Sequence, residues 1–121
     1  MKTIMLVDDS TTILLSLSAI LQKAGYTTKQ ASNAEAALKE FQGGFKPDLL
    51  ITDLHMPGMD GLQFIREVRK LASHKFMPIL FLTTESQQEK RMEAKAAGAS
   101  GWLVKPVQAD ALINTLKQVI R

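Results

Sequence analysis

Two adjacent carboxylates, Asp8 and Asp9, follow the first apolar stretch of the chain, in the sequence IMLVDDS. Two like charges about 5 Å apart repel by roughly 3 kcal/mol at an effective dielectric constant near 20. A second apolar stretch, DLLITD, ends in a third carboxylate, Asp53. Clustered carboxylate oxygens are ligands for hard divalent cations. An aspartate can also act as a nucleophile toward a phosphoryl group.

The hydrophobic pattern predicts the elements that position these acids. Residues 3–7, 48–53 and 78–84 are apolar runs typical of strands buried on both faces, and residues 26–31 and 101–106 predict shorter strands. Stripes of apolar residues predict helices between them, over 13–24, 34–41, 62–72, 86–97 and 112–120. Ser32 and Glu35 have the spacing of a capping box at the start of the second helix.

Five predicted strands therefore alternate with five predicted helices along the chain. This alternation predicts one α/β domain over residues 1–121, a doubly wound five-stranded parallel sheet covered on both faces. In the flavodoxin-like order 2-1-3-4-5, the first and third strands are neighbours at the point where ligands bind. That edge would gather Asp8, Asp9 and Asp53, together with Thr83 and Lys105 from the ends of the last two strands.

The predicted cluster carries excess negative charge. The ammonium group of Lys105 offsets only one of the three carboxylates. A divalent cation would offset the rest, and Mg²⁺ suits oxygen ligands that leave positions for water or phosphate. The sequence therefore predicts a Mg²⁺ site.

The bulk composition excludes several other classes of protein. The 15 Lys and Arg residues exceed the 12 Asp and Glu residues, but they are scattered, which indicates a solvated surface and no nucleic-acid partner. The absence of cysteine excludes disulfides and thiolate metal sites. No stretch approaches the ~18 apolar residues of a membrane span, and the start of the chain is no signal peptide. We expect a cytoplasmic protein without a membrane partner.

Four motifs in order, VDDS, DLLITDLHMPGMDG, LFLTTE and GASGWLVKP, resemble the receiver domain of two-component response regulators, of the stand-alone CheY-like type. The resemblance spans essentially the whole chain. It implies that a histidine kinase or a histidine phosphotransfer protein donates a phosphoryl group to Asp53. It further implies that Asp9 ligates Mg²⁺ directly and Asp8 through water, with the Asp53 carboxylate and the backbone carbonyl of His55 as further ligands.

The resemblance also assigns the remaining site residues. Lys105 pairs with Asp53 and then with a phosphate oxygen, while the Thr83 hydroxyl and the Thr84 amide bind the phosphoryl group. Thr83 moves on phosphorylation, and Trp102 stands where the family usually has a tyrosine or phenylalanine that swings inward. Because indole is larger, its full burial would need a different rotamer, and a half-exposed aromatic residue is the alternative.

Further implications concern neighbouring residues. A cis peptide bond is expected between Lys105 and Pro106. His55 and Glu85 would tune how fast phosphate is lost, whereas His74 is expected to lie in a loop without a role. Leu15 is expected to be exposed, opposite the buried stripe of the first helix and beside Ser18.

The family surface for phosphotransfer partners is the first helix, and the output surface comprises helix 4, strand 5 and helix 5. We expect a monomer or weak dimer that signals to a protein target, because no DNA-binding segment follows Arg121. Chemotaxis and a relay role both stay open, as does the loss of an output domain.

Competing functions are less well supported by the motifs. A phosphatase of the haloacid-dehalogenase type needs D-x-D after the first strand, which DDS does not supply, and no P-loop motif is present. A scaffold without chemistry is disfavoured because every site residue is present. We therefore expect no enzyme, beyond a chain that promotes its own phosphorylation and dephosphorylation.

Overall fold

The computed structural model describes residues 2–84 and 88–120. Within them, five parallel strands form one sheet in the order β2-β1-β3-β4-β5, which confirms the predicted fold. No helix in these residues is long and apolar enough to cross a membrane. The strands are β1 (Thr3–Val7), β2 (Thr27–Ala31), β3 (Leu49–Asp53), β4 (Ile79–Thr83) and β5 (Gly101–Val104). The helices are α1 (Thr11–Lys23), α2 (Ala34–Gln42), α3 (Gly61–Lys70), α4 (Gln88–Ala97) and α5 (Ala109–Val119), with a short 3-10 helix at Ala72–His74.

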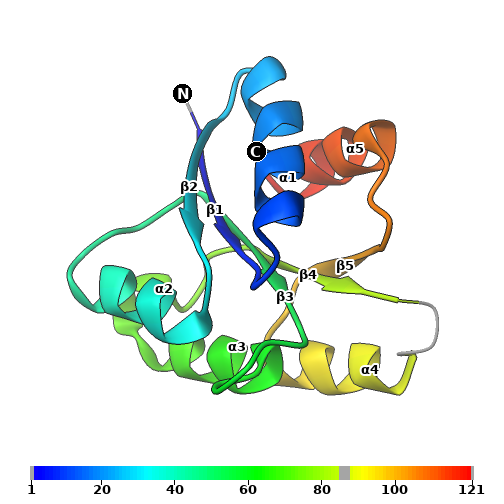
Figure 1. The fold of residues 1–121 in the computed structure, drawn as a ribbon. Helices are drawn as coiled ribbons and strands as arrows, with labels where there is room; N and C mark the ends of the chain where they lie inside the picture. Colours follow the sequence, from blue (N-terminus) through cyan, green and yellow to red (C-terminus); the bar gives the residue numbers. More distant parts are fainter. Residues whose placement is uncertain (1, 85–87, 121) are drawn as a thin grey trace.

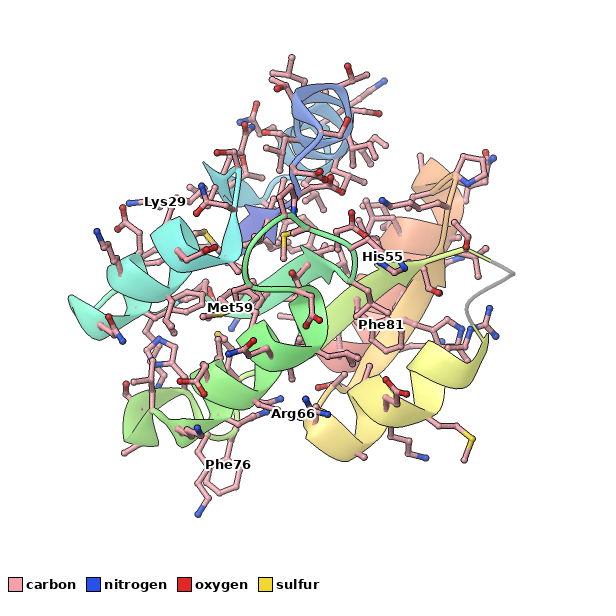
Figure 2. All side chains as sticks on the ribbon, turned by 60° about the horizontal axis from the view of Figure 1, so that its bottom comes forward. Lys29, His55, Met59, Arg66, Phe76 and Phe81 are labelled. Carbon is pink, nitrogen blue, oxygen red and sulfur yellow. The ribbon has the colours of Figure 1, made fainter. Side chains whose placement is uncertain are left out.

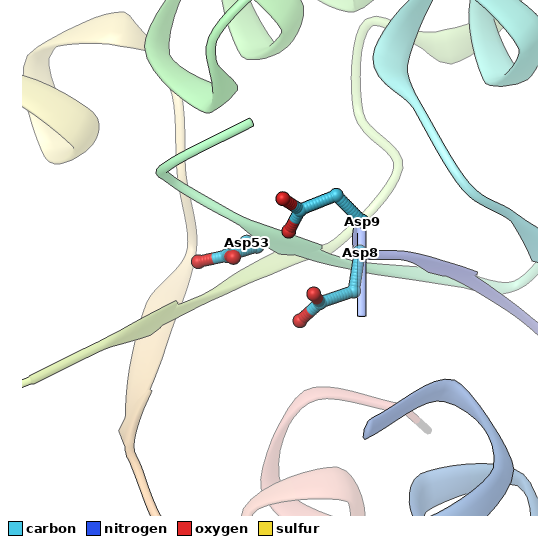
Figure 3. A group of neighbouring side chains, drawn as sticks. All are labelled: Asp8, Asp9 and Asp53. Carbon is cyan, nitrogen blue, oxygen red and sulfur yellow. The ribbon is translucent and has the colours of Figure 1, made fainter. Parts of the chain in front are cut away.

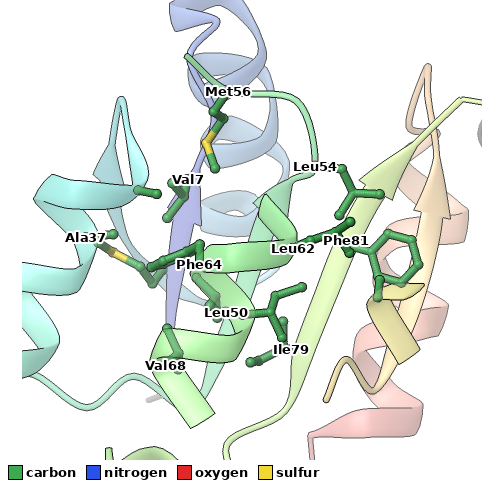
Figure 4. Packing of buried hydrophobic residues seen from close by; sticks show 14 of the residues in the cluster. Val7, Ala37, Leu50, Leu54, Met56, Leu62, Phe64, Val68, Ile79 and Phe81 are labelled. Carbon is green, nitrogen blue, oxygen red and sulfur yellow. The ribbon is translucent and has the colours of Figure 1, made fainter. Parts of the chain in front are cut away.

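Each face of the sheet buries its own apolar core, because successive side chains of a strand point to opposite faces. In β1, Ile4 and Leu6 pack with α1 and α5, whereas Met5 and Val7 pack with α2, α3 and α4 (Figure 1). Figure 4 shows the second core, in which Phe64 of α3 lies against the sheet. The buried strands are therefore covered on both sides, as their continuous apolar sequences predict.

The edge strand β2 is polar and contacts α1 through side-chain hydrogen bonds. The Ser18 and Thr28 hydroxyl oxygens are 2.7 Å apart, and the Gln22 amide donates to the Thr28 hydroxyl at 3.1 Å. Ser18 is only 5% exposed, so its predicted place on the solvent side is wrong. Leu15 is 61% exposed, which confirms the expectation for this residue.

The start of α2 differs from the predicted capping box. Asn33, not Ser32, is the N-cap residue, and its side chain accepts the Ala36 amide at 2.7 Å. Glu35 instead accepts the Met59 amide at 3.4 Å, in the loop that follows β3. Asn and Ser are similarly good N-caps, so local sequence did not distinguish the two positions.

His74 has a structural role, contrary to expectation. Its side chain is fully buried, and its ring lies 4.9 Å from that of Phe41. Nε2 donates to the Phe45 carbonyl oxygen at 2.8 Å, since a carbonyl only accepts, and Nδ1 lies 2.8 Å from the Ser73 hydroxyl. His74 thereby joins the loops that precede β3 and β4.

We predict that Phe64→Ala lowers the free energy of unfolding by about 3–5 kcal/mol, because it opens a cavity in a fully buried site. Leu15→Ala, at an exposed site, should change it by less than about 0.5 kcal/mol. Urea unfolding followed by circular dichroism measures both. Equal losses in the two variants would contradict the assigned packing.

Candidate functional site

Three carboxylates meet at the carboxyl ends of β1 and β3. These strands are paired neighbours, with Val7 opposite Thr52, so Asp8 follows β1 beside Asp53 at the end of β3. Oxygens of Asp8, Asp9 and Asp53 lie within 4.8 Å of one another. Figure 3 shows the three side chains directed into the same space. The predicted triad therefore forms.

Burial distinguishes the three acids. Asp8 and Asp53 are 1% and 6% exposed, whereas Asp9 is exposed. Burial raises the pKa of Asp8; the Ser10 amide, which donates to its Oδ1 at 2.9 Å, lowers that pKa. The Asp53 charge raises it as well, and the Lys105 charge lowers it. The pKa of Asp8 is raised overall, because burial and the Asp53 charge outweigh the Ser10 hydrogen bond and the Lys105 charge.

Lys105 is the cation of the site. Its Nζ lies 3.1 Å from Asp53 Oδ2 and 3.5 Å from Asp8 Oδ2. The residue directly follows β5, and its amide donates to the Thr83 carbonyl oxygen at 2.7 Å. The expected cis peptide bond between Lys105 and Pro106 is confirmed. One ammonium group therefore faces two buried carboxylates.

The residues present fit a Mg²⁺ ion. The cluster offers only oxygen donors, and its three carboxylates exceed the single ammonium charge. Asp8 Oδ2 is buried and accepts no hydrogen bond from the described residues, which leaves it available to an ion or its water. The His55 amide donates to Asp53 Oδ1 at 3.4 Å, so the loop after β3 folds back over the acid. The part played by the His55 carbonyl stays a prediction.

Helix starts next to the strands hold the acids in place. Ser10 is the N-cap of α1, and its hydroxyl oxygen accepts the Ile13 amide at 3.3 Å. Asp60 caps α3, and the following Gly61 packs directly on the end of β3. A Cβ atom at Gly61 would overlap the Asp53 carbonyl oxygen. The sequence pattern predicts a helix only from residue 62, and the contribution of Gly61 is revealed by its close approach to Asp53.

The threonines lie where the sequence predicts. Thr83 is the last residue of β4, fully buried, and its hydroxyl donates to the Thr84 carbonyl oxygen at 3.1 Å. Thr84 follows at the same edge of the sheet and is partly buried. Their proposed contacts with a phosphoryl group stay predictions. Glu85 lies outside the described residues.

Trp102 lies in β5 with 46% of its surface exposed. Its ring centroid is 6.3 Å from that of Phe81, and the Arg91 guanidinium of α4 lies 5.2 Å from the ring. A cation over an aromatic face is attracted by the ring quadrupole. The indole therefore bridges β4 and α4 in the half-exposed arrangement that the sequence left open.

Residues 4–117 match the family described as the response regulator receiver domain. The chain is a response regulator receiver domain. Members of this family act with histidine kinases and downstream proteins in two-component signalling. They bind Mg²⁺ through an acidic cluster, and this receiver domain has such a cluster in Asp8, Asp9 and Asp53.

Three similar proteins are covered by this chain over nearly their whole length. The protein PilH of Pseudomonas aeruginosa is 34% identical, over 99% of this receiver domain and 98% of that protein. The chemotaxis protein CheY of the same organism is 34% identical, over 96% of this chain and 94% of its own. A solved structure of the chemotaxis response regulator CheY4 of Vibrio cholerae has a TM-score of 0.92 at 44% identity, over 98% of each chain.

We predict that Asp8→Asn stabilises the metal-free protein at neutral pH by about 1–2 kcal/mol, because it removes a buried charge that neighbouring acids repel. The amide side chain keeps an acceptor for the Ser10 amide. The extra stability of Asp8→Asn over the wild type should shrink as the pH falls toward about 4. The raised pKa makes Asp8 of the folded wild type take up its proton before the unfolded chain does, so the buried charge disappears there as well.

Thermal unfolding in EDTA across this pH range measures the effect. Added Mg²⁺ should then stabilise the wild type more than Asp8→Asn, by preferential binding to the folded state. A variant less stable than the wild type in EDTA would contradict the assigned charge imbalance.

Proposed function

We propose that this receiver domain is a phosphorylation-dependent switch that accepts a phosphoryl group on Asp53 from a histidine kinase or a histidine phosphotransfer protein. The observation that carries the proposal is the Asp53 carboxylate held 3.1 Å from the Lys105 ammonium, inside a cluster fitted to Mg²⁺. The name of one relative, the chemotaxis protein CheY, supports a place in chemotaxis, and a cytoplasmic setting is part of the proposal.

The transfer needs positioning and charge compensation more than an acid or a base. An Asp53 oxygen attacks the phosphorus of a phosphohistidine, and a P–O bond forms as the P–N bond breaks. The bonding electron pair leaves with the imidazole, which takes up a proton from water. Bound Mg²⁺ supplies positive charge to the phosphoryl oxygens. Asp9 and Asp53 would ligate it directly and Asp8 through water, with the His55 carbonyl, while Lys105 contacts another phosphoryl oxygen.

The same phosphoryl group would change the conformation of the residues around it. In this proposal the Thr83 hydroxyl and the Thr84 amide turn to its oxygens, and Trp102 responds to the vacated space. The indole is tied to α4 through Arg91, 5.2 Å from the ring, so a change at Trp102 reaches α4 directly. The switch thereby alters the surface of α4, β5 and α5 that a protein target binds.

A phosphatase acting on other phosphate esters is the alternative function. It would turn over many times, whereas a switch forms one acyl phosphate per chain. The DDS sequence lacks the second acid that such a phosphatase places two residues after its nucleophile. We therefore propose that the chain catalyses only its own phosphorylation and dephosphorylation.

We predict that acetyl phosphate with Mg²⁺ labels the wild type stoichiometrically and that Asp53→Asn abolishes the label, because an amide oxygen is a poor nucleophile. The adduct should be stable in acid and labile in base, and EDTA should prevent its formation. Intact-mass spectrometry measures it. Undiminished labelling of Asp53→Asn, or labelling in EDTA, would refute the proposed site.

We predict that Leu15→Ala slows phosphotransfer from the cognate kinase at least about threefold while leaving labelling by acetyl phosphate unchanged. Leu15 is 61% exposed on α1, and losing an apolar contact at a docking surface weakens binding by about 1 kcal/mol or more. Ala19→Ser, at another exposed site of the same helix, is the matched control. Equal slowing with both donors would show that Leu15 acts on the chemistry instead.

A further inference from the structure

The rim of the sheet opposite the carboxylates presents an aromatic ring to solvent. Phe76 is 88% exposed, the highest value among the large apolar side chains described. It lies just before β4, which pairs with β3 and β5, and Figure 2 shows it away from the His55 loop. Neither the phosphoacceptor site nor the proposed output surface includes this residue.

The turn that carries Phe76 is firmly held. His74 and Met77 on either side are buried, and His74 bonds the Phe45 carbonyl oxygen at 2.8 Å. Arg69 donates to the His74 carbonyl oxygen at 3.0 Å. The Phe76 ring is therefore exposed on a turn that hydrogen bonds and buried neighbours hold in place.

Lysines scattered along the sequence are gathered at this amino-terminal rim by the fold. Helices that return between parallel strands run opposite to them, so all their carboxyl ends lie on this side of the sheet. Each helix has an exposed lysine in its last turn, namely Lys23, Lys39, Lys70, Lys95 and Lys117. Such residues also compensate helix dipoles. Lys46 and Lys75 do not compensate a helix dipole, because they lie in the loops before β3 and β4.

Charge around Phe76 is positive. Asp48, which lines the same cleft as Phe76, lies 4.0 Å from Lys2 and is therefore itself paired. Neither Lys46 nor Lys75 has an ion pair with a carboxylate of the described residues, and the Lys75 ammonium is 5.8 Å from the Phe76 ring. A cleft of about 330 Å³ separates Lys46 from Phe76 and has Ser73 on its wall. Asp48 also lines this cleft, and Lys75 lies near the Phe76 ring without being part of the cleft lining, so the two lysines lie near the ring without sharing one pocket.

We propose that this rim lies on an anionic phospholipid bilayer, with Phe76 at the level of the headgroups and Lys46 and Lys75 against lipid phosphates. The bases are spread over five helix ends rather than along one groove, which suits an extended negative surface better than a peptide. The phenyl ring gains by entering the apolar edge of a membrane interface, while the lysines face the headgroups. These lysines are scattered along the sequence, and no apolar stretch is long enough to span a membrane, so the sequence alone predicts no membrane partner.

Flotation with vesicles tests the proposal. Wild-type chain should float with phosphatidylcholine vesicles containing about one third phosphatidylglycerol, and not with phosphatidylcholine alone, in a salt-sensitive manner. Phe76→Ser should lower the vesicle partition coefficient about tenfold. The double variant Lys46→Glu, Lys75→Glu should lower it by at least as much. Leu15→Ser, which removes another exposed apolar side chain on α1, is the matched control and should float like the wild type.

Orientation has an independent readout, because the chain contains no cysteine. An environment-sensitive dye on Ala72→Cys, at the cleft, should shift its emission when anionic vesicles are added. The same dye on Ala36→Cys, exposed in the first turn of α2, should not. Circular dichroism and labelling of Asp53 by acetyl phosphate verify that Phe76→Ser is folded.

Three outcomes would overturn the proposal: no flotation of the wild type with anionic vesicles, flotation of Phe76→Ser equal to the wild type, or equal dye shifts at both cysteines. Duplex RNA binding that is as tight as vesicle binding and insensitive to Phe76→Ser would identify a general polyanion surface instead. None of these outcomes depends on whether Asp53 accepts phosphate.

Discussion

Repulsion among three carboxylates at the ends of β1 and β3 is the constraint on which the remaining structure depends. The sheet order makes these strands neighbours, so the acids cannot separate without unpairing the strands. One ammonium group, that of Lys105 directly after the edge strand β5, lies 3.1 Å from Asp53 and compensates part of this charge. That compensation is incomplete, and the incompleteness is what makes the site receptive to a cation and then to a phosphoryl group.

Backbone geometry protects this arrangement. Gly61 lets α3 begin in contact with the end of β3, and Ser10 begins α1 directly after the two acids of β1. Asp8 and Asp9 are therefore fixed by the direct junction of β1 with α1, whereas Asp53 is followed by the loop over residues 54–60, which returns to the strand end at Gly61. These contacts limit how far the carboxylates can move apart, so the free-energy cost of their mutual repulsion is retained in the folded state.

The parts predictable from sequence are those set by local pattern. Continuous apolar strands imply a sheet covered on both faces, and strand order then places Asp8, Asp53 and Lys105 together. His74 could not be predicted, since its partners lie in a loop 29 residues away. The same limit applies to the lysines of the amino-terminal rim, which are distant in sequence. The N-cap of α2 was missed because Ser32 and Asn33 are comparable caps and only tertiary packing chooses between them.

Trp102 gives the receiver domain a built-in optical signal. It is the only tryptophan of the chain, and it touches both β4 and, through Arg91, α4. A guanidinium near an indole ring affects its excited state, so emission intensity depends on the distance between α4 and β5. Rearrangement of these two elements can therefore be followed in real time by fluorescence on the unmodified protein.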